Sequence, residues 1–360
     1  MNRCRSGLSM LELKNLIRPE LLDFKPYISA RHLAGNSGVL LDANENPFDN
    51  TIDISGLNAN RYPDPNQTTL RSALSDYLNI SAENMFAGAG SDEIIDLLIR
   101  LFCIPNRDEV IIIEPTYGMY KVSSEMNGII TRSCLLGDDF DIDISKLDEA
   151  VNEKTKLVFC CSPNNPTGNI LSTDKLLEYT RDNGLILIVD EAYIEFSVLP
   201  SITPKVEDFP NLIVLRTLSK AWGLAGIRLG YCVADEQIVT YLMRIKLPYN
   251  INVLSERVAL LALGNRIVME NAVSDILSER DRLGKEFERL DIFKKVFPSD
   301  ANFLLVLSED ASKTEKFLAE KGIIVRNRSS DPLLDNCLRI TIGTKEQNDL
   351  LLDALREMST

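Results

Sequence analysis

The decisive stretch of this sequence is Leu185-Ile186-Leu187-Ile188-Val189-Asp190-Glu191-Ala192-Tyr193. Its first five residues are apolar at every position, which is typical of a strand buried on both faces of a parallel sheet. Asp190 follows this run directly, and a buried carboxylate requires a cationic partner. The stretch therefore predicts either a positively charged ligand group beside Asp190 or an aspartate that caps the next turn.

Similar apolar runs lie on both sides of this stretch, at Glu109–Ile113, Lys156–Cys161 and Leu212–Leu215. Between the runs, apolar residues recur with helical spacing in Asp92–Phe102 and Lys175–Arg181. This alternation predicts an α/β domain with right-handed crossovers, in which helices cover both faces of a large, mostly parallel sheet.

The pattern changes after about Lys246. We expect helices near Val253–Leu263, Ile267–Leu290, Ser312–Lys321 and Lys345–Arg356, and strands near Phe303–Val306, Ile323–Arg326 and Leu338–Ile342. Residues 41–247 are therefore predicted to form the large domain, and residues 248–360 a smaller α+β domain. Residues 1–40 are predicted to be an arm that packs against the smaller domain or a partner chain.

The composition disfavours several classes of protein. The net charge is −14 and is spread along the chain, so we expect no nucleic-acid partner. No apolar stretch approaches the roughly 20 residues that span a bilayer and no signal peptide is recognised, so we expect no membrane partner and a cytoplasmic location. Seven cysteines without a C-x-x-C pair and one histidine, His32, disfavour a disulfide framework, a metal site or a Ser-His-Asp triad.

Polar residues gather where the predicted strands end. The segments are Ala87–Asp92, Ser162–Gly168, Asp190–Tyr193 and Arg216–Lys220, and each follows an apolar run. The carboxyl edge of an open parallel sheet is where ligands bind. The four segments therefore predict one binding crevice at that edge.

Gly88-Ala89-Gly90-Ser91-Asp92 opens a predicted helix. Its glycines and free backbone N–H groups form an anion site that suits a phosphate, and the alternative is a glycine turn without a ligand. A dinucleotide site would need a third glycine where Glu93 stands, which disfavours that interpretation.

Lys220 directly follows a predicted strand, with Thr217 and Ser219 before it and Arg228 shortly after. Taken alone, a lysine is usually a surface residue. In this setting it fits an amine that forms a Schiff base beside a bound phosphate. A protonated pyridine nitrogen would then be the cation that Asp190 requires.

Together these residues resemble the fold-type-I aminotransferases, which use pyridoxal 5′-phosphate. The resemblance is carried by Ser162–Gly168, Asp190–Tyr193 and Ser219-Lys220 followed by Gly226-x-Arg228-x-Gly230. Within that group, Leu41–Pro47, Arg61–Asp64 and Arg216–Ala221 resemble the histidinol-phosphate aminotransferases. The similarity extends from about Pro26 to Thr344 in the family's order.

The resemblance implies catalytic roles for three residues. Lys220 would carry the cofactor and move a proton between the substrate and the cofactor. Asp190 would pair with the pyridine nitrogen and keep it protonated. Tyr193, together with Asn165, would form hydrogen bonds with the phenolic oxygen of the cofactor ring.

The same resemblance implies how the rest of the cofactor is held. The phosphate would lie among Thr217, Ser219, Arg228 and the backbone of Gly90, Ser91 and Asp92. Tyr117 would stack on the ring. Tyr62 would reach across to a partner's cofactor, which implies a homodimer.

Substrate selection would fall to Arg326 and Arg339, because arginine grips a carboxylate or phosphate through two parallel hydrogen bonds. In the family, one site accepts glutamate in one half-reaction and a phosphate monoester in the other. Asn44, Glu45 and Tyr27 match positions that close over the substrate, and the alternative for Tyr27 is plain packing.

The reaction implied is transamination of L-histidinol phosphate with 2-oxoglutarate, giving imidazole-acetol phosphate and glutamate in histidine biosynthesis. Three alternatives remain open. They are an aminotransferase for aromatic amino acids, a threonine-phosphate decarboxylase, and a ligand-binding regulator with the same fold. The regulator is disfavoured because only residues 1–25 precede the resemblance and the charge is strongly negative.

Overall fold

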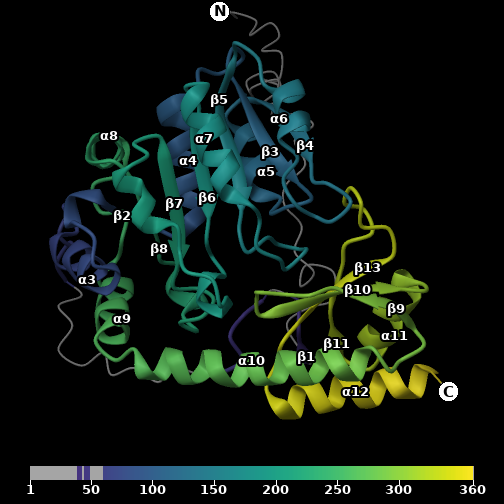
Figure 1. Cartoon of the computed structure of the whole chain (residues 1–360). Helices are drawn as coiled ribbons and strands as arrows, with labels where there is room; N and C mark the ends of the chain where they lie inside the picture. Colours follow the sequence, from purple (N-terminus) through teal and green to yellow (C-terminus); the bar gives the residue numbers. More distant parts are fainter. Residues whose placement is uncertain (1–38, 43, 49–59, 360) are drawn as a thin grey trace, which may run out of the picture.

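The computed structural model describes residues 39–42, 44–48 and 60–359, which form three sheets and the helices around them (Figure 1). The predictions for Tyr27, His32 and most of the arm at 1–40 lie outside these residues. Within the described part of the chain, no helix is both long enough and apolar enough to cross a membrane.

The largest sheet has seven strands and carries the decisive stretch at its centre. In spatial order the strands are β2 (Met85–Gly88), β8 (Gly230–Val233), β7 (Leu212–Thr217), β6 (Ile186–Asp190), β5 (Thr155–Cys161), β3 (Glu109–Glu114) and β4 (Ile130–Leu135). Neighbouring strands are parallel except where β8 pairs with β2 and β7. The predicted mostly parallel sheet is confirmed.

Helices cover both faces of this sheet, as predicted (Figure 1). They are α3 (Thr68–Leu78), α4 (Ser91–Phe102), α5 (Met119–Met126), α6 (Ile144–Ala150), α7 (Thr173–Asp182) and α8 (Glu236–Ile245). In β6, Leu187 and Val189 belong to one hydrophobic cluster, whereas Ile188 belongs to the other. Because alternate residues of a strand face opposite sides, Ile186–Val189 are all apolar and pack on both faces, and Asp190 is the one polar residue of β6.

A smaller four-stranded antiparallel sheet is formed by the C-terminal part of the chain. Its order is β12 (Arg326–Asn327), β13 (Cys337–Thr341), β10 (Phe303–Ser308) and β9 (Phe293–Val296). It is accompanied by α9 (Val253–Leu263), α10 (Ile267–Phe287), α11 (Ala311–Glu320) and α12 (Lys345–Ser359). In Figure 1, α10 extends from beneath the large sheet to the small sheet, and α12 lies along it.

The single strand predicted over Ile323–Arg326 is wrong. The chain instead forms β11 (Ile323–Ile324), which pairs in parallel with β1 (Val39–Leu40), and then β12, which pairs with β13. The reason is non-local, because the backbone of β11 bonds to an N-terminal segment and the backbone of β12 to a C-terminal strand. The backbone of Leu41 also forms hydrogen bonds with this part of the molecule, at Ile324 and Thr341. The domain boundaries at 41 and 248 stay predictions.

Four short 3₁₀ helices complete the described elements: η2 (Ala82–Asn84), η3 (Ile194–Phe196), η4 (Thr203–Glu207) and η5 (Ala225–Ile227).

Strand β8, which was not predicted from the sequence, supports the start of α4. A Cβ atom added to Gly230 would lie 2.4 Å from the backbone nitrogen of Ser91 and 2.7 Å from the carbonyl carbon of Gly90. Only glycine therefore allows β8 to approach the first turn of α4 this closely.

We expect Gly230→Ala to lower the free energy of unfolding by about 1–3 kcal/mol, because backbone rather than a flexible side chain must move. Urea unfolding followed by circular dichroism measures this change. Gly226→Ala is the matched control, since a Cβ atom there meets no atom within 4 Å. Equal stability of the two variants would contradict the close approach.

Candidate active site

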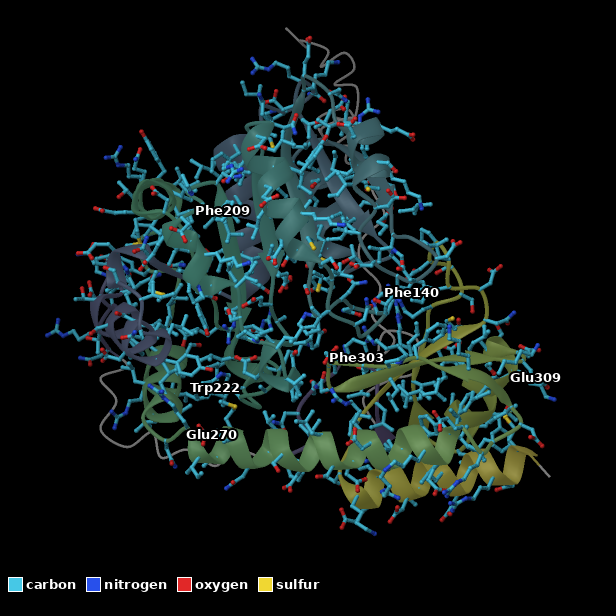
Figure 2. The ribbon with its side chains drawn as sticks, viewed as in Figure 1. Phe140, Phe209, Trp222, Glu270, Phe303 and Glu309 are labelled. Atoms are coloured by element: carbon cyan, nitrogen blue, oxygen red, sulfur yellow. The ribbon has the colours of Figure 1, made fainter. Side chains whose placement is uncertain are left out.

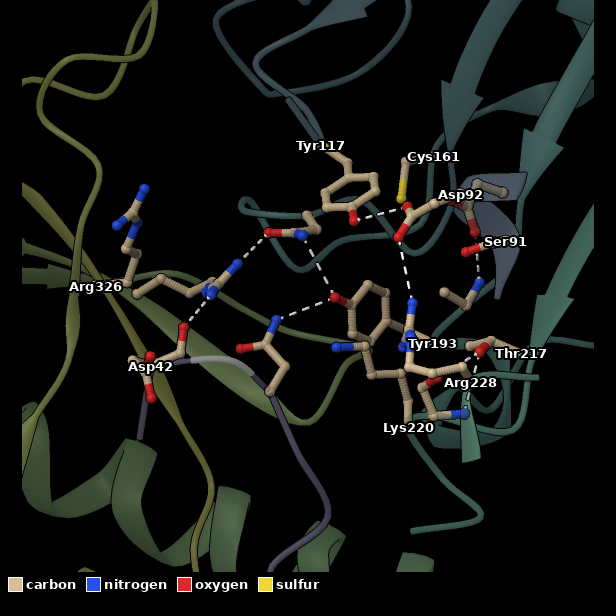
Figure 3. Close-up of a pocket in the computed structure, with 16 residues that line it drawn as sticks. Asp42, Ser91, Asp92, Tyr117, Cys161, Tyr193, Thr217, Lys220, Arg228 and Arg326 are labelled. Atoms are coloured by element: carbon tan, nitrogen blue, oxygen red, sulfur yellow. Dashed lines mark hydrogen bonds and ion pairs between the residues drawn. The ribbon is translucent and has the colours of Figure 1, made fainter. Parts of the chain in front are cut away.

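A cavity of about 230 Å³ opens where the parallel strands β5, β6 and β7 end, facing the small sheet (Figure 3). It is lined by Asp42, Asn44, Ser91, Asp92, Tyr117, Cys161, Asn165, Asp190, Ala192, Tyr193, Thr217, Ser219, Lys220, Arg228, Arg326 and Arg339. Most of the predicted site residues are therefore brought together in one place. The carboxyl-edge rule predicted this position.

Asp190 ends β6 and is buried at the wall of the cavity. One carboxylate oxygen, Oδ2, accepts a hydrogen bond from the hydroxyl of Tyr120 at 2.7 Å, and Oδ1 accepts one from the backbone N–H of Ala192 at 3.0 Å. Burial raises the pKa of Asp190 to about 6, and the hydrogen bond from Tyr120 is the largest opposing effect. A cationic ring nitrogen in the cavity would restore the charged carboxylate.

Lys220 follows β7 and contributes its side chain to the same cavity (Figure 3). Burial lowers the pKa of Lys220 to about 8, and the guanidinium of Arg339 adds to this effect. Such an amine loses its proton more readily than an ordinary lysine, and its unprotonated form can act as a nucleophile. The Nζ atom lies 5.7 Å from the centre of the Tyr193 ring.

Two amide side chains donate hydrogen bonds to the hydroxyl of Tyr193. It accepts hydrogen bonds from Nδ2 of Asn44 at 3.0 Å and from Nδ2 of Asn165 at 3.3 Å. The Tyr193 ring also packs edge-on against Phe303 of β10, with 5.3 Å between ring centres. Figure 2 shows Phe303 at the end of the small sheet that is nearest the large sheet. Because both amides donate to this oxygen, the hydroxyl proton is left to point toward a ligand.

Asn44 joins the small sheet to this arrangement. Its side-chain oxygen accepts a hydrogen bond from the hydroxyl of Thr341 at 2.9 Å, and its backbone N–H donates to the same hydroxyl at 3.0 Å. The amide of Asn302 donates to the carbonyl of Asn44 at 3.0 Å. Asn44 has a left-handed backbone (φ 55°), which asparagine tolerates better than most residues.

Two arginines extend into the cavity from neighbouring strands. Arg326 of β12 is the register partner of Arg339 of β13. Arg339 is buried and donates to the side-chain oxygen of Asn165 and to the carbonyl of Asp42, both at 2.6 Å. A pair of guanidinium groups held at one wall forms a site for a carboxylate or a phosphate.

The opposite end of the cavity is built around the start of α4. Gly90 is its N-cap residue with φ 82°, and a Cβ atom there would lie 2.7 Å from Nη2 of Arg228. Thr217 donates from its hydroxyl to that of Ser219 at 2.9 Å. A helix N-terminus, two hydroxyls and a guanidinium together form a site for a phosphate.

Asp92 lies between two of these groups. Its Oδ1 atom accepts a hydrogen bond from the hydroxyl of Tyr117 at 3.0 Å, and its Oδ2 atom lies 3.3 Å from Nη2 of Arg228 (Figure 3). The carboxylate therefore orients the Tyr117 ring at the cavity and partly neutralises the guanidinium of Arg228.

Four predicted site residues are not among those that line the cavity. Gly90 caps α4 behind it, and Glu45 lies near enough for its charge to oppose the lowering of the pKa of Lys220. Tyr62 is 81% exposed and stacks on Tyr249 at 4.5 Å. Tyr27 lies outside the described residues.

Sequence patterns did not identify Asp42, Cys161, Ala192 and Tyr120 as site residues. The first three line the cavity. Tyr120 contacts Asp190 from behind, and its one sequence signal is its place three residues after Tyr117 on the same helix start. Among the described residues, no group of three or more His, Cys, Asp or Glu could hold a metal ion.

Comparisons with known proteins identify the family. The chain belongs to the family of class I and II aminotransferases, whose model matches residues 36–355. Within it, the chain is 45% identical over 350 residues to histidinol-phosphate aminotransferase of Christiangramia forsetii, covering 96% of this chain and 98% of that one. The enzyme of the same name from Parabacteroides distasonis is also 45% identical over 350 residues, covering 97% and 99%.

Solved structures share the fold. A histidinol-phosphate aminotransferase from Clostridium acetobutylicum superimposes with a TM-score of 0.79 at 26% identity, covering 89% of this chain and 98% of that one. One from Sinorhizobium meliloti, in complex with pyridoxal 5′-phosphate, gives 0.83 at 24% identity, covering 95% and 98%. This chain is thus an aminotransferase that uses pyridoxal phosphate.

The cavity fits that cofactor. It has a buried carboxylate for a ring nitrogen, a lysine of lowered pKa for the aldehyde, and a helix N-terminus for the phosphate. These three groups come from β6, from the segment after β7 and from α4. The cofactor site therefore forms only when these three elements are packed together.

We expect Asp92→Asn to strengthen binding of inorganic phosphate to the cofactor-free protein by about threefold, the size of a partly exposed ion pair. The substitution removes the negative charge beside Arg228 while keeping an oxygen that can accept from Tyr117. Isothermal titration calorimetry measures the dissociation constant, with Asp96→Asn, on the same helix but outside the cavity lining, as control. Unchanged or weaker phosphate binding in Asp92→Asn would contradict this interpretation.

Proposed function

We propose that the chain transfers the amino group of L-histidinol phosphate to 2-oxoglutarate, giving imidazole-acetol phosphate and glutamate in histidine biosynthesis. The observation that carries this proposal is the Arg326–Arg339 pair, which faces Lys220 across one cavity. Both reaction partners present an anion that this wall can bind, the phosphate of one and a carboxylate of the other. The relatives at 45% identity bear the name of this activity.

Lys220 and Asp190 are proposed to be the two groups on which the chemistry depends. Bound pyridoxal phosphate supplies an electron-accepting ring that stabilises the negative charge formed when a proton leaves the substrate α-carbon. Asp190 would keep the ring nitrogen protonated, and Lys220 would take the proton from the substrate α-carbon and deliver it to the C4′ carbon of the cofactor. With a pKa lowered to about 8 by burial, Lys220 can act both as base and as acid near neutral pH.

The remaining predicted site residues are proposed to position the cofactor and the substrate. Tyr193 and Asn165 would bond to the phenolic oxygen, and Tyr117 would cover the ring face. The phosphate of the cofactor would be held by Thr217, Ser219, Arg228 and the backbone of Gly90, Ser91 and Asp92. Asn44, Glu45 and Tyr27 would complete the substrate side, where Asn44 already links Tyr193 to the small sheet.

We expect the purified protein to show a visible absorbance band from lysine-bound cofactor that is bleached by histidinol phosphate. Lys220→Ala should bind the cofactor without this band and lose at least about 10³-fold in turnover, because the residue that moves the proton is missing. Spectra before and after each substrate measure both effects. Arg326→Gln should raise the KM for histidinol phosphate, since a charge-assisted hydrogen-bond donor is lost.

The same spectra, together with an assay for released carbon dioxide, distinguish the alternatives. A band that responds to phenylalanine and not to histidinol phosphate would establish an aromatic aminotransferase. Release of carbon dioxide from threonine phosphate would establish a decarboxylase. A band that no amino donor changes would favour a ligand-binding regulator, and no band after adding the cofactor would contradict the enzyme proposal.

We also propose that the enzyme is a homodimer that acts in the cytoplasm. Tyr62, Leu247 and Tyr249 expose apolar side chains, with Leu247 at 72% exposure, and Tyr62 stacks on Tyr249. A second copy covering this patch would bring Tyr62 toward its cofactor. The cysteines within the described residues are all buried and free, as a reducing compartment would allow.

Leu247→Glu should convert the dimer to a monomer and weaken cofactor binding, because a buried charge at an interface is costly and the partner's Tyr62 is withdrawn. Sedimentation velocity gives the oligomeric state. Leu350→Glu is the control, since Leu350 is exposed on α12, away from the patch. A wild-type monomer with full activity would contradict the dimer.

A further inference from the structure

Tyr120 lies behind the wall of the active-site cavity and contacts its key carboxylate. The residue stands in the first turn of α5, is fully buried, and is not among the residues that line the cavity. Its hydroxyl donates to Oδ2 of Asp190 at 2.7 Å, whereas Oδ1 accepts from the backbone N–H of Ala192 at 3.0 Å. Asp190 is therefore held at both oxygens from the protein side, with the remaining lone pairs available to the cavity.

The Tyr120 ring is fixed by its neighbours. It stacks on Phe159 of β5, with 5.0 Å between ring centres and 11° between planes. It packs edge-on against Tyr117, at 5.6 Å and 85°. Because the ring is held on two sides, the position of its hydroxyl follows from the packing of α5 on β5.

The start of α5 therefore contacts two carboxylates of the cavity. Tyr117, just before the helix, bonds to Asp92, which pairs with Arg228 (Figure 3). Tyr120, three residues later, bonds to Asp190. A displacement of this turn would disturb both carboxylates together.

We propose that Tyr120 is the positioning residue of Asp190, and that its hydroxyl keeps the carboxylate oriented and ionised to hold the protonated ring nitrogen of the cofactor. The inference rests on the proposed function of Asp190. Burial disfavours a charged carboxylate, and the hydrogen bond from Tyr120 is the largest effect that counters it. Without the hydroxyl, the pKa of Asp190 rises.

The environment of Asp190 determines how this effect depends on pH. The titratable groups that face it are Asp92 from α4, Tyr120 from α5, Cys160 and Cys161 from β5, Tyr193 after β6 and Lys220 after β7. All of these groups except Tyr120 are unchanged in Tyr120→Phe. The ratio of the dissociation constant of the variant to that of the wild type therefore reports the effect of the lost hydroxyl. Phenylalanine keeps the ring between Phe159 and Tyr117.

The experiment uses the holoenzyme of Tyr120→Phe and measures the dissociation constant of pyridoxal phosphate at pH 6, 7 and 8. We expect affinity to fall by about tenfold at pH 6, as for loss of a hydrogen bond to a charged group, and by less at pH 8. The loss of affinity is larger at pH 6 because the raised pKa leaves Asp190 more protonated in the variant. At pH 8 the carboxyl of Asp190 is ionised in both proteins. The ¹⁵N chemical shift of ring-labelled cofactor should move toward the unprotonated value.

Two comparisons separate positioning from packing. Tyr231→Phe removes a hydroxyl that is equally buried and has no hydrogen-bond partner among the described residues, so its affinity should stay within about twofold of wild type. In an Asp190→Asn background, Tyr120→Phe should add almost nothing, because the two residues act through one interaction.

Wild-type affinity, pH dependence and ¹⁵N shift in Tyr120→Phe would overturn the inference, as would effects of Tyr120→Phe and Asp190→Asn that simply add. A wild-type protein that binds no pyridoxal phosphate would instead contradict the proposed function. A fold-wide role of Tyr120 would lower the melting temperature without changing the ¹⁵N shift, and that result also overturns the inference.

Discussion

The structure depends on one buried carboxylate. Asp190 ends a strand whose side chains are divided between two hydrophobic clusters, so it has no route to solvent except through the cavity. Two hydrogen bonds from the protein side only partly offset this burial, and its pKa stays raised to about 6. A cationic ring nitrogen of the cofactor would stabilise the ionised carboxylate of Asp190, because a buried charge requires an opposite charge.

The charges around the cavity explain which ligands suit it. Four cations, Lys220, Arg228, Arg326 and Arg339, face three carboxylates, Asp42, Asp92 and Asp190. Arg228 and the pair of Arg326 and Arg339 lie at opposite ends, so two separate anions can be bound at once. The low pKa of Lys220 arises from burial and from Arg339, which links the substrate wall to the reactivity of the amine.

Much of this site could be predicted from the sequence because the rule that governs it is local. Asp190 ends β6, Lys220 lies three residues after β7, and Ser91 begins α4, so their convergence follows from the order of strands and helices. Tyr120 could not be predicted, since a tyrosine on an amphipathic helix has the same pattern whether it packs or donates a hydrogen bond. The break between β11 and β12 was missed because it depends on pairing with Val39–Leu40, far away in the chain.

That pairing has a consequence for how the protein is made. Val39 donates its backbone N–H to the carbonyl of Gly322, and Leu41 bonds to both Ile324 and Thr341. Strand β1 therefore cannot form these hydrogen bonds until β11 and Thr341 have been synthesised, after most of the chain. The pairing is therefore a long-range contact of the kind that slows folding, and all strands of the large sheet are synthesised before β11 can pair with β1.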